Sequence, residues 1–151
     1  MNRSRKIRGF LLIVVIVIQF IQPTKNISEG PDADDISNVY TIPSDVHETF
    51  KQKCYDCHSN NTRYPWYFHV QPIGWWLAAH IHDAKAELNF SEFKTYDSDE
   101  TEHKFEDIME MVEERAMPLK AYVLLHPHTE ITEEDEQAIG AWINTLVAPE
   151  N

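Results

Sequence analysis

Apolar residues recur at helical spacing over most of the chain after residue 43. A first helix is expected to begin at Ser44, and it repeats an apolar side chain at every fourth position: Val46, Phe50 and Cys54. A second is expected from Pro72 to about Leu88, since proline suits a first helical position. Its apolar stripe comprises Trp76, Leu77, His80, Ile81, Ala84 and Leu88. Between the two, residues 60–68 combine turn-forming asparagines with an aromatic cluster that lacks clean periodicity.

Two further helices complete this pattern. The third is expected to begin at Ser98, with acidic residues in its first turn and a buried edge formed by Phe105, Ile108 and Val112. The fourth is expected to be capped by Thr132 and to turn four residues inward: Ile139, Trp142, Ile143 and Leu146. No strand alternation of useful length is present. The sequence therefore predicts an all-α fold.

The amino-terminal segment has a different pattern. It opens with four basic residues, Arg3, Arg5, Lys6 and Arg8. An apolar run from Phe10 to Ile21 follows, broken only by Gln19, which is typical of an export signal. The run is short for a membrane span, yet no small-x-small cleavage site follows it. Residues 1–25 are therefore interpreted as a signal peptide or as an uncleaved anchor held by residues 9–22, with a buried core helix as the alternative.

Composition and charge narrow the class of protein. Residues 26–43 are polar and are expected to form a linker, which leaves residues 44–148 for one small domain. The chain has a formal net charge of −12. Five of its 13 basic residues precede residue 26, so residues 26–151 carry 8 basic against 25 acidic residues, a net charge of −17. Such a surface argues against nucleic-acid binding and favours a basic partner, although a solvated acidic coat is the simpler alternative.

Both cysteines of the chain lie in one pentapeptide, Cys54-Tyr55-Asp56-Cys57-His58. The pattern C-x-x-C-H is that of covalent haem attachment. Two thiols two residues apart can each add to one vinyl group of the porphyrin, and the next side chain then provides an imidazole for the iron. We therefore expect Cys54 and Cys57 to attach one haem c, with His58 as the proximal iron ligand.

Three other uses of the cysteine pair have to be weighed. A thioredoxin-like redox pair needs a βαβ setting, which the helical pattern does not offer. A zinc site would need ligands from a second spaced pair, and an inert disulfide leaves His58 without a role. The export signal supports the haem interpretation, because haem is attached to C-x-x-C-H on the outer face of the bacterial membrane.

The iron needs a second ligand or an open position opposite His58. Met117 precedes Pro118 in a segment between the third and fourth expected helices, where proline bars helix continuation. A thioether there would favour ferrous iron and raise the reduction potential. Met117 is therefore the predicted distal ligand. An open iron is one alternative, and the others are four histidines: His80, His82, His126 and His128.

Several blocks of sequence form a recognisable set with the pentapeptide. They are Ser59-Asn60, Tyr64-Pro65-Trp66-Tyr67, Trp75-Trp76-Leu77, Leu88-Asn89-Phe90-Ser91-Glu92-Phe93, Met117-Pro118-Leu119-Lys120 and Leu125-His126-Pro127. This set resembles the small haem-binding domain family of exported bacterial proteins over about residues 50–146. The resemblance implies a small cytochrome c-like domain wrapped around one covalently bound haem, preceded by the signal or anchor helix.

The cytochrome c-like pattern also implies how the helices pack. The helix before the haem motif would cross the carboxy-terminal helix. Val46 and Phe50 would then meet three residues of the last helix, Trp142, Ile143 and Leu146, with Gly140 permitting a close approach.

The expected ligands indicate a function. Iron held by histidine and methionine has no open position, so the sequence predicts single-electron transfer in the periplasm with redox partner proteins, which would dock through a basic face. One alternative is a haem-based gas or peroxide sensor, or a small peroxidase, with an exchangeable sixth ligand. Another is an accessory subunit with a structural haem. No nucleophile constellation, phosphate loop or paired-carboxylate signature indicates another enzyme.

Overall fold

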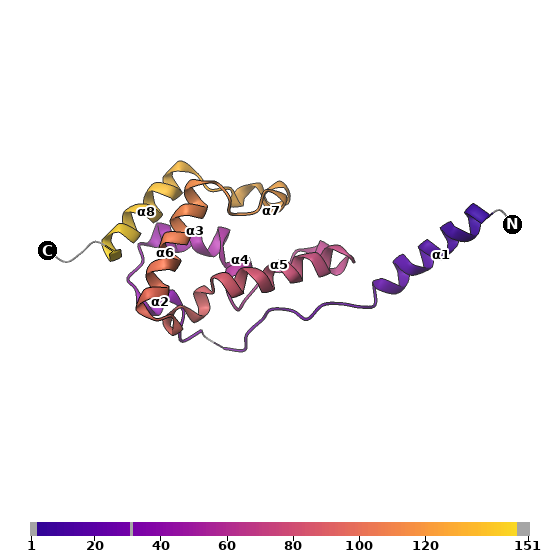
Figure 1. Cartoon of the computed structure of the whole chain (residues 1–151), viewed down its shortest axis with the longest axis horizontal. Helices are drawn as coiled ribbons and strands as arrows, with labels where there is room; N and C mark the ends of the chain where they lie inside the picture. Colours follow the sequence, from indigo (N-terminus) through magenta and orange to yellow (C-terminus); the bar gives the residue numbers. More distant parts are fainter. Residues whose placement is uncertain (1–2, 31, 148–151) are drawn as a thin grey trace.

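Helices account for the regular elements among residues 3–30 and 32–147, which are the residues that the computed structural model describes (Figure 1). In chain order they are α1 (Arg3–Ile18), α2 (Ile36–Val39), α3 (Ser44–Lys53), α4 (Tyr55–His58), η1 (Trp66–His69), α5 (Ile73–Glu87), η2 (Phe90–Thr95), α6 (Ser98–Glu113), α7 (Lys120–Leu125), η3 (Pro127–Thr129) and α8 (Glu133–Val147). An isolated antiparallel bridge joins Ile27 to Asn61. The predicted all-α class is confirmed.

A large hydrophobic cluster joins α3, η2, α6 and α8, which gather at one end of the domain in Figure 1. The Phe50 ring of α3 stacks on Phe90 at 5.0 Å between centroids and meets Trp142 of α8 edge-on at 5.8 Å. Phe105 of α6 approaches the same indole at 5.8 Å. Burying each such ring contributes on the order of 1.5–3 kcal/mol. The helix before the motif therefore packs across the last helix, as the resemblance implied.

A second, smaller cluster lies between η1 and α5. Its buried members are Tyr67, Phe68, Leu77 and Ile81. The two elements approach closely at Gly74, where a Cβ atom would lie 2.0 Å from the carbonyl oxygen of Phe68. The predicted stripe of α5 is wrong for Trp76, which is 44 % exposed. The face that η1 covers is centred on Gly74, Leu77 and Ile81, and Trp76 lies outside it.

Gly140 permits a close approach, but with a different helix from the one expected. A Cβ atom at this position would lie 3.1 Å from Cε of Met109. Met109 belongs to α6, and α6 packs against α8. The missing side chain of Gly140 therefore makes room for α6 rather than for α3.

The described residues between 26 and 43 pack on the domain, although the sequence predicts a polar linker there. Ile36 of α2 is fully buried in the large cluster. Asp35 caps α2 by accepting a hydrogen bond from the amide of Ser37 at 2.9 Å, and it accepts another from the Tyr55 hydroxyl at 3.1 Å. The polar side chains that suggested a solvated linker are thus used for capping and for contacts with the haem motif.

α1 differs from the other helices in its surroundings. The side chains of α1 are exposed along most of the helix, and Ile18 at its end is half-buried. Among residues 3–30 and 32–147, no helix combines the length and the apolar character that crossing a membrane requires.

Lys53 at the end of α3 forms an ion pair with Asp135 in the first turn of α8. Burial would raise the pKa of Asp135, but hydrogen bonds from Lys53, from Thr132 and from the Thr49 hydroxyl at 2.8 Å outweigh it. The pKa of this carboxyl is therefore lowered to about 2. The Thr132 hydroxyl also accepts a hydrogen bond from the Asp135 amide at 3.2 Å, which confirms the predicted cap.

Replacing Gly74 by alanine is expected to lower the free energy of unfolding by about 1–3 kcal/mol, because the added methyl group meets a backbone carbonyl that cannot easily move. Gly140→Ala is the matched control, since the flexible Met109 side chain can shift. That variant should be neutral or stabilised by up to about 1 kcal/mol, as alanine is favoured in helices. Urea unfolding followed by circular dichroism measures both. Equal losses would contradict the close contact at Gly74.

Asp135→Asn is expected to cost about 2 kcal/mol of stability near pH 6 and progressively less as the pH falls from about 4 to about 2. The folded-state pKa lies below the unfolded value, so the stabilisation is present above the unfolded pKa and is lost as the pH falls through the folded one. Denaturant unfolding at a series of pH values tests this. The control is Asp83→Asn, whose carboxylate is 81 % exposed; a constant cost for Asp135→Asn across the series would refute the prediction.

Candidate functional site

The cysteine and histidine residues of the pentapeptide lie where the two hydrophobic clusters meet. Cys54 stands between α3 and α4 and packs against the large cluster. Cys57, one helical turn later on α4, packs against the small cluster. Both are free thiols and both are half-buried. The motif therefore joins the two parts of the core.

The surroundings of the two thiols keep them neutral. Burial raises the pKa of Cys54 to about 12, and the neighbouring Cys57 adds to this effect. Burial likewise raises the pKa of Cys57 to about 11, with a further contribution from Asp56. Reactive C-x-x-C pairs have a lowered thiol pKa. This environment therefore does not favour the redox-thiol alternative.

A hydrogen bond to the carboxy-terminal end of α5 holds His58 in place. Its Nδ1 lies 3.0 Å from the carbonyl oxygen of Leu88, the residue that caps α5. A carbonyl can only accept, so Nδ1 carries the proton and Nε2 keeps its lone pair. Burial lowers the pKa of His58, which keeps the ring neutral. Metal-binding histidines are usually neutral and donate their second N–H to such a carbonyl. The residues present therefore fit the donor set that a c-type haem requires.

Asp56, inside the motif, connects α4 to two later segments. One carboxylate oxygen accepts a hydrogen bond from Nε of Arg63 at 2.9 Å. The other accepts a hydrogen bond from the Tyr122 hydroxyl of α7 at 2.8 Å. Sequence reasoning missed this contact, because the two middle positions of C-x-x-C-H are free to vary and a lone tyrosine carries no pattern.

Met117 lies in the connection between α6 and α7 and is half-buried. Its amide donates a hydrogen bond to the carbonyl of Met111 at 3.3 Å. The hydrogen bond from Tyr122 to Asp56 brings the helix that follows this connection to the motif. The role of Met117 as an iron ligand stays a prediction.

The histidine alternatives differ in their surroundings. Nδ1 of His80 lies 2.9 Å from the carbonyl oxygen of Trp76, and Nδ1 of His126 lies 3.2 Å from that of Tyr122. Both rings are half-buried, and each retains Nε2 for another partner. His82 and His128 are exposed. The environments of His80 and His126 therefore resemble that of His58 more closely than the environments of His82 and His128 do.

Comparison with protein families resolves which class of domain this geometry belongs to. The model of the haem-binding domain family matches residues 13–145. The chain belongs to the haem-binding domain family. Comparison with curated proteins and with solved structures finds no match. Family membership confirms the resemblance seen in the sequence blocks and identifies haem as the ligand of the domain.

The described residues do not provide the set of ligands that the zinc alternative requires. Over residues 3–30 and 32–147, no three His, Cys, Asp or Glu side chains are grouped so as to hold a metal ion.

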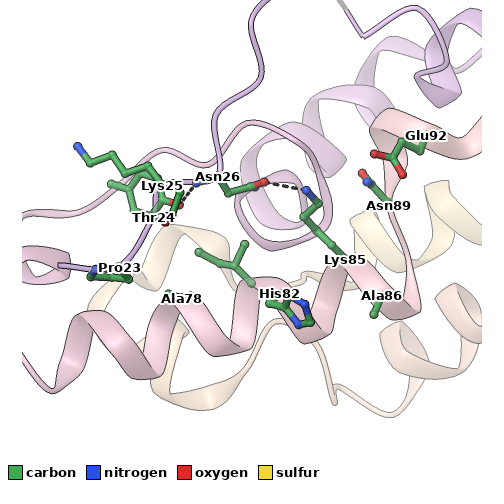
Figure 2. Close-up of a pocket in the computed structure, with 12 residues that line it drawn as sticks. Pro23, Thr24, Lys25, Asn26, Ala78, His82, Lys85, Ala86, Asn89 and Glu92 are labelled. Atoms are coloured by element: carbon green, nitrogen blue, oxygen red, sulfur yellow. Dashed lines mark hydrogen bonds between the residues drawn. The ribbon is translucent and has the colours of Figure 1, made fainter. Parts of the chain in front are cut away.

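A cavity of about 490 Å³ is lined by residues of the segment after α1 and of α5 (Figure 2). It separates residues 23–26 from α5 and the start of η2. Nζ of Lys85 donates to Oδ1 of Asn26 at 2.8 Å across it, and the amide of Asn26 donates to the Tyr64 hydroxyl at 2.6 Å. The thiols and His58 do not form its walls. In this haem-binding domain, the cavity is therefore distinct from the proposed attachment site.

Proposed function

We propose that this haem-binding protein is a mono-haem, c-type cytochrome-like carrier of single electrons. The thiols of Cys54 and Cys57 attach the porphyrin, and Nε2 of His58 binds the iron. The observation that carries the proposal is the 3.0 Å contact between Nδ1 of His58 and the Leu88 carbonyl oxygen. It fixes the tautomer and orientation of a ring that directly follows two free cysteines.

The bound haem supplies an iron that alternates between the ferric and ferrous states. The protein supplies its environment. Because Cys54 packs on the large cluster and Cys57 on the small one, attachment through both thiols holds the porphyrin at the junction of the two. The ring of His58 meets that of Phe90 edge-on, with ring centroids 6.5 Å apart. Apolar and aromatic groups at this junction exclude water, which raises the reduction potential.

Met117 completes the coordination in this proposal. Support comes from its half-buried position in a non-helical connection and from the Tyr122–Asp56 hydrogen bond that ties the next helix to the motif. Iron with histidine and methionine ligands has no open position, so the site passes electrons rather than binding a gas or peroxide.

The protein acts outside the cytoplasmic membrane and exchanges electrons with partner proteins. Basic residues followed by an apolar run at the amino terminus support export. The net charge of −17 over residues 26–151 supports docking to a basic face of the partner.

Replacing both cysteines tests the covalent attachment. Cys54→Ser/Cys57→Ser is expected to lose all haem that resists extraction by acidified acetone, because no thioether can form. Haem staining of the denatured protein on a gel gives a second readout. His103→Ala, an exposed substitution on α6, is the control and should stain like the wild type. Complete extraction of haem from the wild-type protein would show that attachment is not covalent.

Met117→Leu tests the distal ligand while nearly conserving side-chain volume. The variant is expected to lose the methionine-to-ferric charge-transfer absorption band and to bind carbon monoxide rapidly when reduced, since leucine cannot ligate iron. Met111→Leu, a half-buried methionine on α6, is the matched control and should keep the band. A band that survives in Met117→Leu would remove Met117 from the site. Rapid carbon monoxide binding by the wild type would favour the sensor or peroxidase alternative.

A further inference from the structure

The segment after α1 is fixed to the haem-binding domain by hydrogen bonds. Oε1 of Gln19 accepts from the Gln71 amide at 2.8 Å, and Nε2 of Gln19 donates to the Gln71 carbonyl at 3.1 Å. Oε1 of Gln22 accepts from the Gln71 side chain at 3.1 Å. The indole of Trp75 donates to the carbonyl of Ile21 at 2.7 Å. α1 therefore leaves the domain at one defined place, where η1 ends and α5 begins (Figure 1).

The same end of the domain exposes large apolar side chains. This surface lies at the amino-terminal end of α5 and is called the α5 end. It comprises Trp66, Val70, Ile73 and Trp76. Trp66 is 79 % exposed, so it contributes little to the buried cluster beneath it. Phe20 and Ile21, which follow α1, are exposed too, and the hydrogen bond from Trp75 holds the backbone of Ile21 against α5. Apolar surface thus continues from α1 onto the folded domain.

The α5 end is also free of formal charge. Residues 64–82 contain no Asp, Glu, Lys or Arg, whereas residues 26–151 as a whole carry 33 such residues. An acidic surface is repelled by anionic lipid headgroups. The α5 end is therefore a face that approaches a bilayer without this repulsion. Tryptophan and tyrosine are enriched where proteins meet the membrane–water interface, because their rings are apolar and carry one polar group.

We propose that the α5 end rests in the headgroup region of a phospholipid bilayer and continues the lipid contact of the apolar run of residues 10–21. Two observations identify lipid as the partner of this surface. The surface continues an apolar helix whose own side chains are exposed, and it contains aromatic residues but no charged ones. This goes beyond the proposed function, which uses the apolar run only as support for export, by placing residues 10–21 in contact with lipid. Its consequence is a fixed orientation of the haem motif relative to the membrane.

Lipid photo-labelling of the full-length protein tests this surface. The protein is incorporated into vesicles of phosphatidylcholine and phosphatidylglycerol that contain a phospholipid with a diazirine near the headgroup. Mass spectrometry then locates the adducts. We expect adducts on residues 66–76 in addition to those on residues 10–21.

Ile73→Glu and Val39→Glu form a matched pair, because the two side chains are 44 % and 40 % exposed. Ile73→Glu should lose labelling of residues 66–76 several-fold, since a charge is introduced at the lipid contact. Val39→Glu, on α2, should keep it. Circular dichroism tests whether each variant is folded. If Ile73→Glu is unfolded, the labelling of residues 66–76 in the wild type alone tests the membrane contact.

Three results would overturn the proposal: wild-type adducts confined to residues 10–21, adducts spread equally over α6 and α8, or cross-links between the α5 ends of two copies in place of lipid adducts. The haem spectrum, recorded on the same samples, separates this proposal from the proposed function. Absence of covalent haem with residues 66–76 still labelled would refute only the electron-transfer function. A normal spectrum without that labelling would refute only the membrane contact.

Discussion

The hydrogen bond between His58 and the Leu88 carbonyl is the constraint on which the site depends. A carbonyl is available there only because α5 ends at Glu87, so that the backbone of Leu88 turns away from the helix axis. Asn89 enforces the end by capping η2 through a hydrogen bond from the Ser91 amide at 3.1 Å. Phe90 then enters the large cluster and stacks on Tyr55 of the motif at 5.1 Å. One short segment thus ends a helix, supplies the acceptor for His58 and packs against the motif.

The core is divided into two clusters, and the motif that His58 belongs to lies between them. A single core would place both thiols in one environment, whereas here Cys54 belongs to one cluster and Cys57 to the other. The contact of Asp56 with Tyr122 holds α7 against the same four-residue helix. α4 is therefore the element to which α3, α5 and α7 are all attached. In the proposed function, a porphyrin bound to α4 adds apolar surface at the junction and stabilises the arrangement further.

The parts of the fold that depend on local periodicity were predictable, and those that depend on distant polar partners were not. Phe50, Phe105 and Trp142 lie on regular apolar faces, so their burial follows from the sequence. The contact of Tyr122 with Asp56 joins residues 66 positions apart, and neither residue belongs to a repeating pattern. The same reason explains why the sequence predicts a linker at residues 26–43: the segment is held by hydrogen bonds to the motif region and by isolated apolar contacts such as that of Ile36, not by a repeating apolar stripe. The cysteine spacing points to haem from sequence alone because the chemistry itself fixes that spacing.

The distribution of charge links the two proposals. The acidic first turns of α6 and α8 belong to the part of the domain that lies away from α1 in Figure 1, while the charge-free α5 end adjoins α1. Near an anionic bilayer, repulsion acts on the acidic helices and the apolar end approaches the lipid. In this orientation, the acidic surface faces the aqueous side, where a soluble partner with a basic face would dock. A single uneven distribution of charge would therefore both set the orientation of the domain on the membrane and leave its docking surface accessible.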